Sequence, residues 1–284
     1  MIPSNFDYVA PTTVDDAVAA LAQAGEDAKV IAGGQSLMPV LRLRLAAPTT
    51  LVDLNRIDEL RGVREDGDAL VVGAMTTYYD LLRNPLISQH ALLLAEAVRT
   101  VADPQIRHRG TLGGNLAHAD PAGDLAAPAL ALDATMTVAG PSGRRTVGAD
   151  EFFVDYFTTA LQPDEILTEI RIPKHTAWAA RYEKMHRVAQ AWSIVAVAAT
   201  VDVDDGVIRQ ARIALTNMTS VPVRARGVEE ALVGQTASDD LIRAAAEHAV
   251  EGVDPMSDGN ADADYRSHLA KVLTRRAVVT AIGA

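Results

Sequence analysis

The strongest chemical signal in the sequence is a pair of short glycine-rich segments. The first reads Ala-Gly-Gly-Gln-Ser-Leu-Met-Pro over residues 32–39, and the second begins Thr-Leu-Gly-Gly-Asn at Thr111. Glycine lets a ligand approach the backbone closely, and successive N–H groups in such a turn form a concavity that binds anions. Ser36, Thr111 and Asn115 would add side-chain donors. Two such turns facing each other would hold both phosphates of a dinucleotide without any lysine. The alternative is that both are only tight turns, because Gly-Gly pairs are common.

Most signatures of catalytic or metal-binding chains are missing from the sequence. There is no cysteine, which excludes disulfide bonds, a cysteine nucleophile, a thiolate zinc site and an iron–sulfur cluster held by this chain's own cysteines. No G-x-x-x-x-G-K-[ST] phosphate loop, H-E-x-x-H zinc motif or G-x-S-x-G serine elbow occurs, and the seven histidines show no ligand spacing. We therefore expect no metal site and no catalytic acid, base or nucleophile.

Composition and charge narrow the class of protein further. The 284 residues include 26 Lys and Arg against 37 Asp and Glu, a formal net charge of −11. An acidic chain disfavours nucleic-acid binding, which needs clustered basic residues. Residues 1–7 show no signal-peptide pattern, and the longest apolar stretch, 194–201, is far shorter than the roughly 20 residues of a membrane helix. We expect a cytoplasmic protein with no transmembrane segment and no nucleic-acid partner.

The first 175 residues alternate between helical and strand patterns. Hydrophobic periodicity, caps and breakers predict helices at residues 13–24, 76–83, 86–98 and 121–132. The same reasoning predicts strands at residues 29–32, 50–54, 69–73 and 164–172, with a hairpin formed by 134–139 and 144–147.

After Pro173 the pattern changes. Three long strands are predicted at 180–186, 193–203 and 207–217, and three helices at 222–232, 238–250 and 262–282. A meander followed by helices is typical of an α+β domain. We place one domain boundary near residue 175 and a weaker one near residue 57. The predicted units are 1–57, 58–175 and 176–284.

At this point the residues carry a family resemblance. The two glycine segments, about 75 residues apart, resemble the two FAD-binding loops of the flavoprotein subunit of molybdenum hydroxylases, the xanthine dehydrogenase superfamily. Residues 182–193, Tyr-Glu-Lys-Met-His-Arg-Val-Ala-Gln-Ala-Trp-Ser, resemble the Y-x-K segment that opens the C-terminal domain of that family. The resemblance runs from Pro3 to the last predicted helix and is strongest to the branch that oxidises carbon monoxide. It implies an α+β fold: a vanillyl-alcohol-oxidase-type FAD-binding domain in two subdomains, followed by a three-stranded antiparallel sheet with helices.

The resemblance also assigns the two loops to the FAD pyrophosphate. Backbone N–H groups would supply most of the donors, from two facing sides. The first loop would contribute Ala32, Gly33, Gly34, Gln35, Ser36 and Leu37. The second loop would contribute Thr111, Gly113, Gly114 and Asn115.

Three further residues match single positions of the family. Asp124 matches an acid that hydrogen-bonds the cofactor; alternatively it is a helix cap or a solvated side chain. Leu161 matches an apolar position beside the flavin, or is plain core. Lys184 matches a lysine near the isoalloxazine, where a cation would favour the reduced flavin; alternatively it is a surface residue at the end of a strand.

Some residues near these positions keep an open role. Trp192 departs from the family's usual pattern and either packs near the ring or fills the core. Residues 107–109, Arg-His-Arg, could hold the pyrophosphate or a partner chain, or form a solvated loop. Some vanillyl-alcohol-oxidase-type enzymes attach FAD covalently through histidine, which draws attention to His118. The resembled subunits bind FAD non-covalently, and we expect the same here.

By resemblance, this chain is an electron-transfer subunit. Substrate would be oxidised at a molybdenum cofactor on a large partner, and electrons would pass through [2Fe–2S] clusters on a small partner to FAD here, then to an acceptor such as a quinone. The expected assembly is a dimer of heterotrimers that includes the C-terminal helices among its contacts, is cytoplasmic and could attach peripherally to a membrane. The alternatives are a flavin subunit for an aldehyde, a purine or an N-heterocycle, a stand-alone FAD-dependent oxidase, or a flavin-free scaffold.

Overall fold

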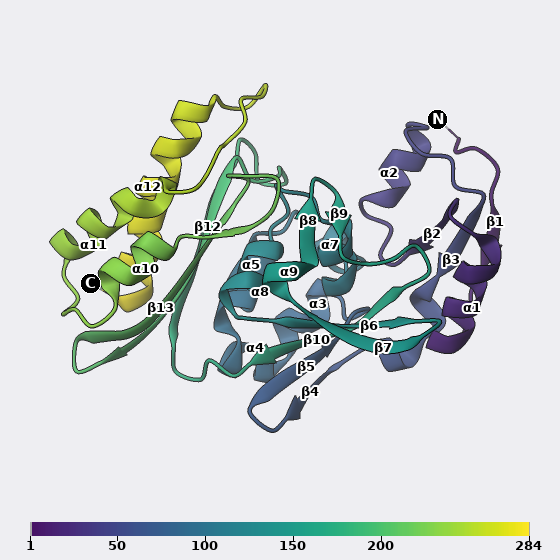
Figure 1. Cartoon of the computed structure of the whole chain (residues 1–284), viewed down its shortest axis with the longest axis horizontal. Coiled ribbons are helices and arrows are strands. Elements are labelled where there is room, and N and C mark those ends of the chain that lie inside the picture. The colour runs from purple at the N-terminus through teal and green to yellow at the C-terminus, as the bar shows by residue number, and fades with distance from the viewer. Residues whose placement is uncertain (1, 284) are drawn as a thin grey trace.

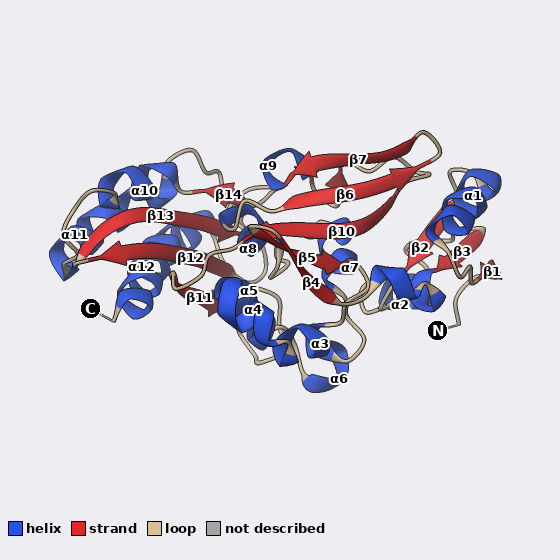
Figure 2. Ribbon diagram, turned by 90° about the horizontal axis from the view of Figure 1, so that it is seen from below, coloured by secondary structure: helices blue, strands red, loops and turns tan. Residues whose placement is uncertain are grey.

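A computed structural model describes residues 2–283 of the chain (Figure 1). The N-terminal elements and the C-terminal helices lie at opposite ends of an elongated molecule, and the residues between them form its middle (Figures 1 and 2). Within residues 2–283 there is no helix with the length and apolar character needed to cross a membrane.

The N-terminal sheet has three parallel strands in the order β1-β3-β2. They are β1 (Asp7–Val9), β2 (Ala28–Ile31) and β3 (Thr50–Asp53). Helix α1 (Val14–Ala24) begins as predicted, because the side chain of Thr13 accepts the N–H of Asp16. It ends at Gly25, whose φ of 78° suits glycine. Helix α2 (Leu37–Arg42) follows β2, and the 3-10 helices η1 (Leu54–Arg56) and η2 (Asp58–Leu60) lead to the next sheet.

The central sheet has five strands in the order β4-β5-β10-β6-β7, all paired antiparallel. They are β4 (Val63–Asp66), β5 (Ala69–Gly73), β6 (Thr135–Gly140), β7 (Gly143–Gly148) and β10 (Ile166–Pro173). A small hairpin is formed by β8 (Phe153–Asp155) and β9 (Thr158–Thr159). The helices of this part are α3 (Tyr78–Arg83), α4 (Pro85–His90), α5 (Leu92–Thr100), α6 (Pro104–Arg107), α7 (Leu112–His118), α8 (Ala126–Ala131) and α9 (Ala149–Phe152).

The C-terminal sheet is antiparallel, but it has four strands rather than the predicted three. They are β11 (Ala179–Met185), β12 (Val195–Asp204), β13 (Val207–Thr216) and β14 (Val223–Arg224). Strand β14 has only two residues, which is too few to show an alternating pattern, and both lie inside the predicted helix 222–232. The helices are α10 (Arg226–Leu232), α11 (Asp239–Ala246), the 3-10 helix η3 (Glu247–Val250) and α12 (Ala263–Ile282).

Strand β12 explains how this sheet joins the middle of the molecule to the C-terminal helices. Side chains alternate between the two faces of a strand. Ala196 and Ala198 belong to the core shared with the central helices, whereas Val195, Val197 and Val201 belong to the core shared with α10, α11 and α12. The small alanines allow the central elements to pack closely on one face, and the valines fill the other.

Two helix predictions in the middle of the chain were wrong in extent. The predicted helix 121–132 shrinks to α8, because residues before it form turns in which the N–H of Ala122 bonds the carboxylate of Asp120. The predicted helix 86–98 is two helices, interrupted at Ala91 with φ −141° and ψ 50°. Helix α3 is capped by Thr77, while Thr76 bonds Gly62 instead. Helix α7 begins within the second glycine segment and was not predicted.

Candidate functional site

A cavity of about 770 Å³ lies where the N-terminal sheet, the central helices and strand β11 meet. Its size falls within the roughly 300–1,000 Å³ of small-molecule sites. The predicted site residues on its wall are Ala32, Gly33, Gly34, Gln35, Ser36, Leu37, Thr111, Gly114, Asn115, Asp124, Leu161 and Lys184. Only Gly113 among the predicted site residues lies outside this lining. The fold thus brings residues from four separate parts of the sequence, 32–37, 111–124, 161 and 184, to one cavity.

The first glycine loop presents free backbone donors to this cavity. Among the described residues, no protein acceptor is bonded to the N–H groups of residues 33–37. Gly34 has a φ of 74°, a conformation that other residues rarely adopt, and the N–H of Met38 bonds its carbonyl to start α2. A run of five residues that line a cavity, and whose N–H groups have no acceptor within the described protein, suits the binding of an anion.

The second glycine loop faces the first at close range. Thr111 caps α7, and its side chain accepts the N–H of Gly114 at 3.1 Å. A Cβ on Gly114 would lie 2.7 Å from the Thr111 hydroxyl oxygen and 3.3 Å from the Cβ of Ala32. Gly114 therefore permits the close approach of the two loops. The Thr111 hydroxyl still has its own proton to donate to a ligand.

The structure corrects the expectation for Gly113. Its N–H donates to the carbonyl of Ala74 at 2.9 Å, so that donor is not available to a ligand. A Cβ on Gly113 would lie 2.5 Å from the Cβ of Ala74. Gly113 therefore serves the packing of α7 against the end of β5. Adjacent glycines in one motif have different roles because they face opposite sides of the helix start.

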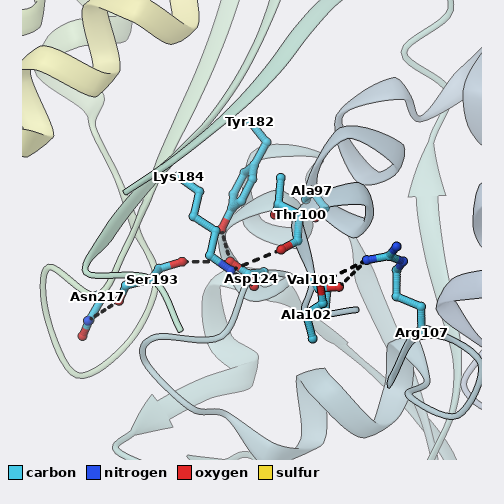
Figure 3. Close-up of polar contacts among 10 residues, drawn as sticks. All are labelled: Ala97, Thr100, Val101, Ala102, Arg107, Asp124, Tyr182, Lys184, Ser193 and Asn217. Carbon is cyan, nitrogen blue, oxygen red and sulfur yellow. Dashed lines mark hydrogen bonds and ion pairs between the residues drawn. The ribbon is translucent and has the colours of Figure 1, made fainter. Parts of the chain in front are cut away.

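Asp124 and Lys184 form a buried ion pair on the cavity wall (Figure 3). The Lys184 ammonium donates to Oδ2 of Asp124 at 2.7 Å, and the two side chains are 2% and 5% exposed. The hydroxyls of Tyr182 and Ser193 donate to Oδ1 at 2.9 and 2.8 Å. The pKa of Tyr182 is raised well above its usual value, first by burial and then by the charge of Asp124.

These contacts change the interpretation of both residues. Neither alternative of a surface lysine or a solvated aspartate holds, since both side chains are buried. Asp124 accepts three hydrogen bonds from the protein itself, which differs from an acid whose main partner is the cofactor. Lys184 is not an isolated cation, because the carboxylate balances its charge. The sequence offered no sign of this pairing across 60 positions.

The carbonyl groups at the C-terminal end of α5 and directly after it lie beside this ion pair, and residues 101 and 102 line the cavity. Lys184 lies 3.4 Å from the carbonyl oxygen of Thr100, and Nη1 of Arg107 donates to the carbonyls of Val101 and Ala102 at 2.8 and 3.2 Å (Figure 3). Cations near the exposed carbonyls of a helix C-terminus are stabilising. Arg107, one of the residues with an open role, is thus committed to shaping the loop beside the cavity.

The remaining residues with open roles are also placed. Gly33 packs on the carbonyl of Arg109, and His108 stacks on Tyr79 with ring centroids 4.0 Å apart. Trp192 lines the cavity and is half exposed, so it is not core. His118 also lines the cavity, and burial lowers its pKa, which keeps the ring neutral at pH 7.

The sequence reasoning missed many of the lining residues, and two of them, Tyr78 and Gln190, make polar contacts that shape the wall. Tyr78 is 5% exposed, burial raises its pKa, and its N–H bonds the carbonyl of Gly110 at 3.0 Å. Gln190 donates to the carboxylate of Asp103 at 2.7 Å and joins the β11–β12 connection to the central helices. The only sequence signal for Tyr78 was its position directly after Thr77, the residue that caps α3.

The loops and the cavity suit an anionic ligand of the size of a dinucleotide cofactor. Comparison with known families then specifies the class. Residues 4–175 match the FAD-binding domain in molybdopterin dehydrogenase, and residues 180–281 match the CO dehydrogenase flavoprotein C-terminal domain. The chain belongs to this family of FAD-binding medium subunits of molybdenum hydroxylases, and is thus an oxidoreductase subunit.

Individual relatives resemble the chain over its whole length. The carbon monoxide dehydrogenase medium chain of Hydrogenophaga pseudoflava is 42% identical, and the alignment covers 98% of this chain and 97% of that one. A solved carbon monoxide dehydrogenase from the same organism, lacking the Mo-pyranopterin moiety of its molybdenum cofactor, matches with a TM-score of 0.97 and 43% identity, covering 100% of this chain and 99% of that one. Quinoline 2-oxidoreductase from Pseudomonas putida 86 matches with a TM-score of 0.95 and 34% identity, with the same coverage.

Proposed function

We propose that this chain holds FAD non-covalently in the cavity and serves as the electron-transfer subunit of a carbon monoxide dehydrogenase. The run of unpaired N–H groups at residues 33–37, facing the cap of α7, is the observation that carries the cofactor assignment. It supplies donors for two phosphates in a chain with a net charge of −11. The identity of 42% to a carbon monoxide dehydrogenase medium chain supports the substrate assignment.

The cavity suggests how the cofactor would lie. The pyrophosphate would occupy the middle, held by the N–H groups of residues 33–37 on one side and by the Thr111 and Asn115 side chains on the other. One end is formed by α1 and β2 and would take the adenine; the other end is formed by Leu161, Lys184 and neighbouring residues and would take the isoalloxazine. When bound, FAD supplies the capacity to accept and release electrons, and the protein supplies position and electrostatics.

The proposed path places this chain between partners. Electrons would come from [2Fe–2S] clusters on a small partner subunit, after oxidation of carbon monoxide at molybdenum on a large one. They would leave to a quinone. The proposed assembly is a cytoplasmic dimer of heterotrimers. The absence of cysteine supports the placement of the clusters on a partner subunit, because this chain offers no thiolate ligands for clusters of its own.

We also propose the division into units 1–57, 58–175 and 176–284. The end of the first family match at residue 175 and the start of the second at residue 180 support the later boundary. The parallel sheet β1-β3-β2, distinct from the antiparallel central sheet, supports the earlier one.

The experiment is co-expression of the chain with the products of neighbouring genes, followed by cofactor analysis and a carbon monoxide-dependent dye-reduction assay. We expect one FAD per copy of this chain and activity with carbon monoxide. FAD without carbon monoxide oxidation, but with oxidation of a quinoline or an aldehyde, would replace the substrate assignment with the alternative that the quinoline 2-oxidoreductase match favours. A complex without flavin would overturn the cofactor assignment.

A further inference from the structure

Asp124 is the meeting point of three donors that all come from the C-terminal part of the chain. Tyr182 and Lys184 lie on β11, and Ser193 lies just before β12. Asp124 itself precedes α8 and is 4% exposed. Three hydrogen bonds, one of them from an ammonium group, hold this carboxylate in one orientation. The side chain therefore places a fixed negative charge directly at the cavity wall.

The backbone around Ser193, whose hydroxyl donates to this carboxylate, is itself held by hydrogen bonds from the C-terminal part of the chain. The Ser193 carbonyl accepts from Nδ2 of Asn217 at 2.9 Å (Figure 3). The Ile194 carbonyl accepts from the same nitrogen at 3.2 Å and from Arg266. Arg266 is 2% exposed and also pairs with Asp258 at 2.8 Å. The segment that carries Ser193 thus has little freedom, and its hydroxyl keeps Asp124 in one orientation.

The ammonium group of Lys184 uses two of its N–H groups within the described protein. This group carries three N–H bonds. One is directed to Asp124 at 2.7 Å, and another lies near the Thr100 carbonyl at 3.4 Å. Lys184 is one of the residues that line the cavity, and among the described residues its third N–H has no protein acceptor. Without Asp124, the Lys184 ammonium would keep only its longer contact with the Thr100 carbonyl.

We propose that Asp124 is a positioning residue that aims Lys184 at the ring end of the cavity and offsets its charge, which keeps the reduction potential of the bound flavin below the value that Lys184 alone would impose. This inference rests on the proposed FAD site and deepens it. A positive charge beside the ring stabilises the reduced, more negative flavin and raises the potential. A paired carboxylate weakens that effect.

Other charged groups of the cavity lining and its surroundings keep their own contacts, so their charges stay in place when either member of the pair is substituted. Arg107 is bonded to the carbonyls of Val101 and Ala102, and Asp103 accepts from Gln190. Glu165 is matched by Arg145 at 2.6 Å. A substitution at Lys184 or Asp124 therefore changes the net charge of this pair and leaves the surrounding charges as they are.

The test is the flavin midpoint potential, measured by spectroelectrochemical titration of the FAD-loaded complex. We expect Asp124→Asn to raise the ratio of reduced to oxidised flavin at a fixed electrode potential by about tenfold, a shift of roughly 30 mV for a two-electron couple. Lys184→Met should shift the ratio in the opposite direction. The double variant should return close to the parent value, because both charges are gone.

Asp133→Asn is the matched control. Asp133 also joins the two parts of the chain, through Arg212 at 2.9 Å and Arg224 at 3.1 Å, but it does not line the cavity. If Asp124 acts only as a structural link, both aspartate variants should lose stability and leave the potential unchanged. An unshifted potential in FAD-loaded Asp124→Asn overturns the inference.

Failure of the inference can be told apart from failure of the proposed function. A parent complex without FAD overturns the proposed site, and the inference falls with it. A parent complex with FAD and an unshifted Asp124→Asn overturns the inference alone. If Asp124→Asn does not fold, the comparison of FAD-loaded Lys184→Met with the FAD-loaded double variant decides the matter: a higher ratio in the double variant supports the effect of the Asp124 charge, and equal ratios overturn it.

Discussion

Gly33 packs against the carbonyl group of Arg109 with no room for a side chain between them, because a Cβ at this position would overlap the carbonyl oxygen and lie 3.0 Å from the Cα of Gly110. Gly33 is therefore needed for the contact between the first loop and the segment that leads into the second. A spacing of 76 positions in the sequence becomes direct backbone contact in the fold.

Substitution Gly33→Ala should weaken FAD binding by forcing the loops apart. Overpacking of this kind costs about 1–3 kcal/mol. Where this cost falls on the bound conformation, affinity drops by about fivefold to about 140-fold, since 1.4 kcal/mol is a factor of ten. Fluorescence titration of FAD measures the change. Gly259→Ala is the control, because a Cβ there would meet nothing within 4 Å. Equal affinity of Gly33→Ala and the parent protein would refute the loop contact.

Gly113→Ala should act on the fold and spare the ligand contacts. Its Cβ would lie 2.5 Å from the Cβ of Ala74, in the packing of α7 against the end of β5. We expect the free energy of unfolding of the FAD-free chain to fall by about 1–3 kcal/mol. Urea denaturation measures this loss. An unchanged unfolding midpoint combined with weakened FAD binding would restore the role in phosphate binding that the sequence suggested.

Glu229→Ala should be among the most destabilising single changes in the C-terminal part. Glu229 is 6% exposed, accepts Nε and Nη2 of Arg224 at 2.6 and 2.8 Å, and accepts the backbone N–H of Ile213 at 2.7 Å. Removing one member of a buried ion pair costs about 3–5 kcal/mol, because the partner charge stays buried. Chemical denaturation should show this loss.

The control for Glu229 is Arg226→Ala. Arg226 reaches the same carboxylate from 3.9 Å, but its side chain is 67% exposed. Exposed pairs contribute about 1 kcal/mol or less. Similar losses for the two variants would mean that burial does not set the strength of this cluster.

Acid should weaken the chain partly through Glu165. Arg145 donates to both carboxylate oxygens, at 2.8 and 2.6 Å, and this lowers the pKa of Glu165 from its ordinary 4.5; burial opposes the shift, and the N–H of Gln162 adds to it. A lowered pKa in the folded state means that the stabilisation is complete above pH 4.5 and is lost as the pH falls through the folded-state pKa.

Thermal unfolding across this acid range provides the measurement. We expect the parent protein to lose stability more steeply below pH 4.5 than Glu165→Gln, which has no carboxylate to protonate. Arg145→Gln should flatten the profile in the same way, because it removes the donor that lowers the pKa. Parallel acid profiles for all three proteins would assign the acid sensitivity elsewhere.

FAD should leave the chain on acid precipitation. His118 is on the cavity wall and neutral at pH 7, but its Nε2 lies 3.9 Å from the carboxylate of Asp120, and its ring lies 5.3 Å from that of Phe157. These contacts give the ring a packing role. Flavin in the supernatant, identified by chromatography, is the expected result. Flavin that stays with the precipitated polypeptide would show a covalent link, and His118→Ala would then locate it.

Much of the fold was predictable because it follows from rules that act over a few residues. Thr13 caps α1 and Gly25 ends it, as their positions in the sequence suggest. Asp205 and Gly206 adopt left-handed backbone conformations in the turn between β12 and β13, which the Asp-Asp-Gly sequence favours. The alternating pattern of the long C-terminal strands is equally local. These features need no knowledge of the rest of the molecule.

Features that depend on where distant segments meet could not be predicted. Nothing near Gly113 and Gly114 shows that one packs on Ala74 and the other faces Ala32. Strand β14 exists only because β13 offers it an edge to pair with. The predicted helix 121–132 starts late because its first residues turn toward Lys184 and Tyr182 instead.

The sequence by itself determined the two glycine loops, the absence of thiolate ligands and the order of the main helices and strands, because backbone preferences and composition are local properties. Only the tertiary structure decided that Asp124 and Lys184 neutralise each other, 60 positions apart. Electrostatic energy depends on distance in space and on burial, and both are set when β11 packs against the central helices.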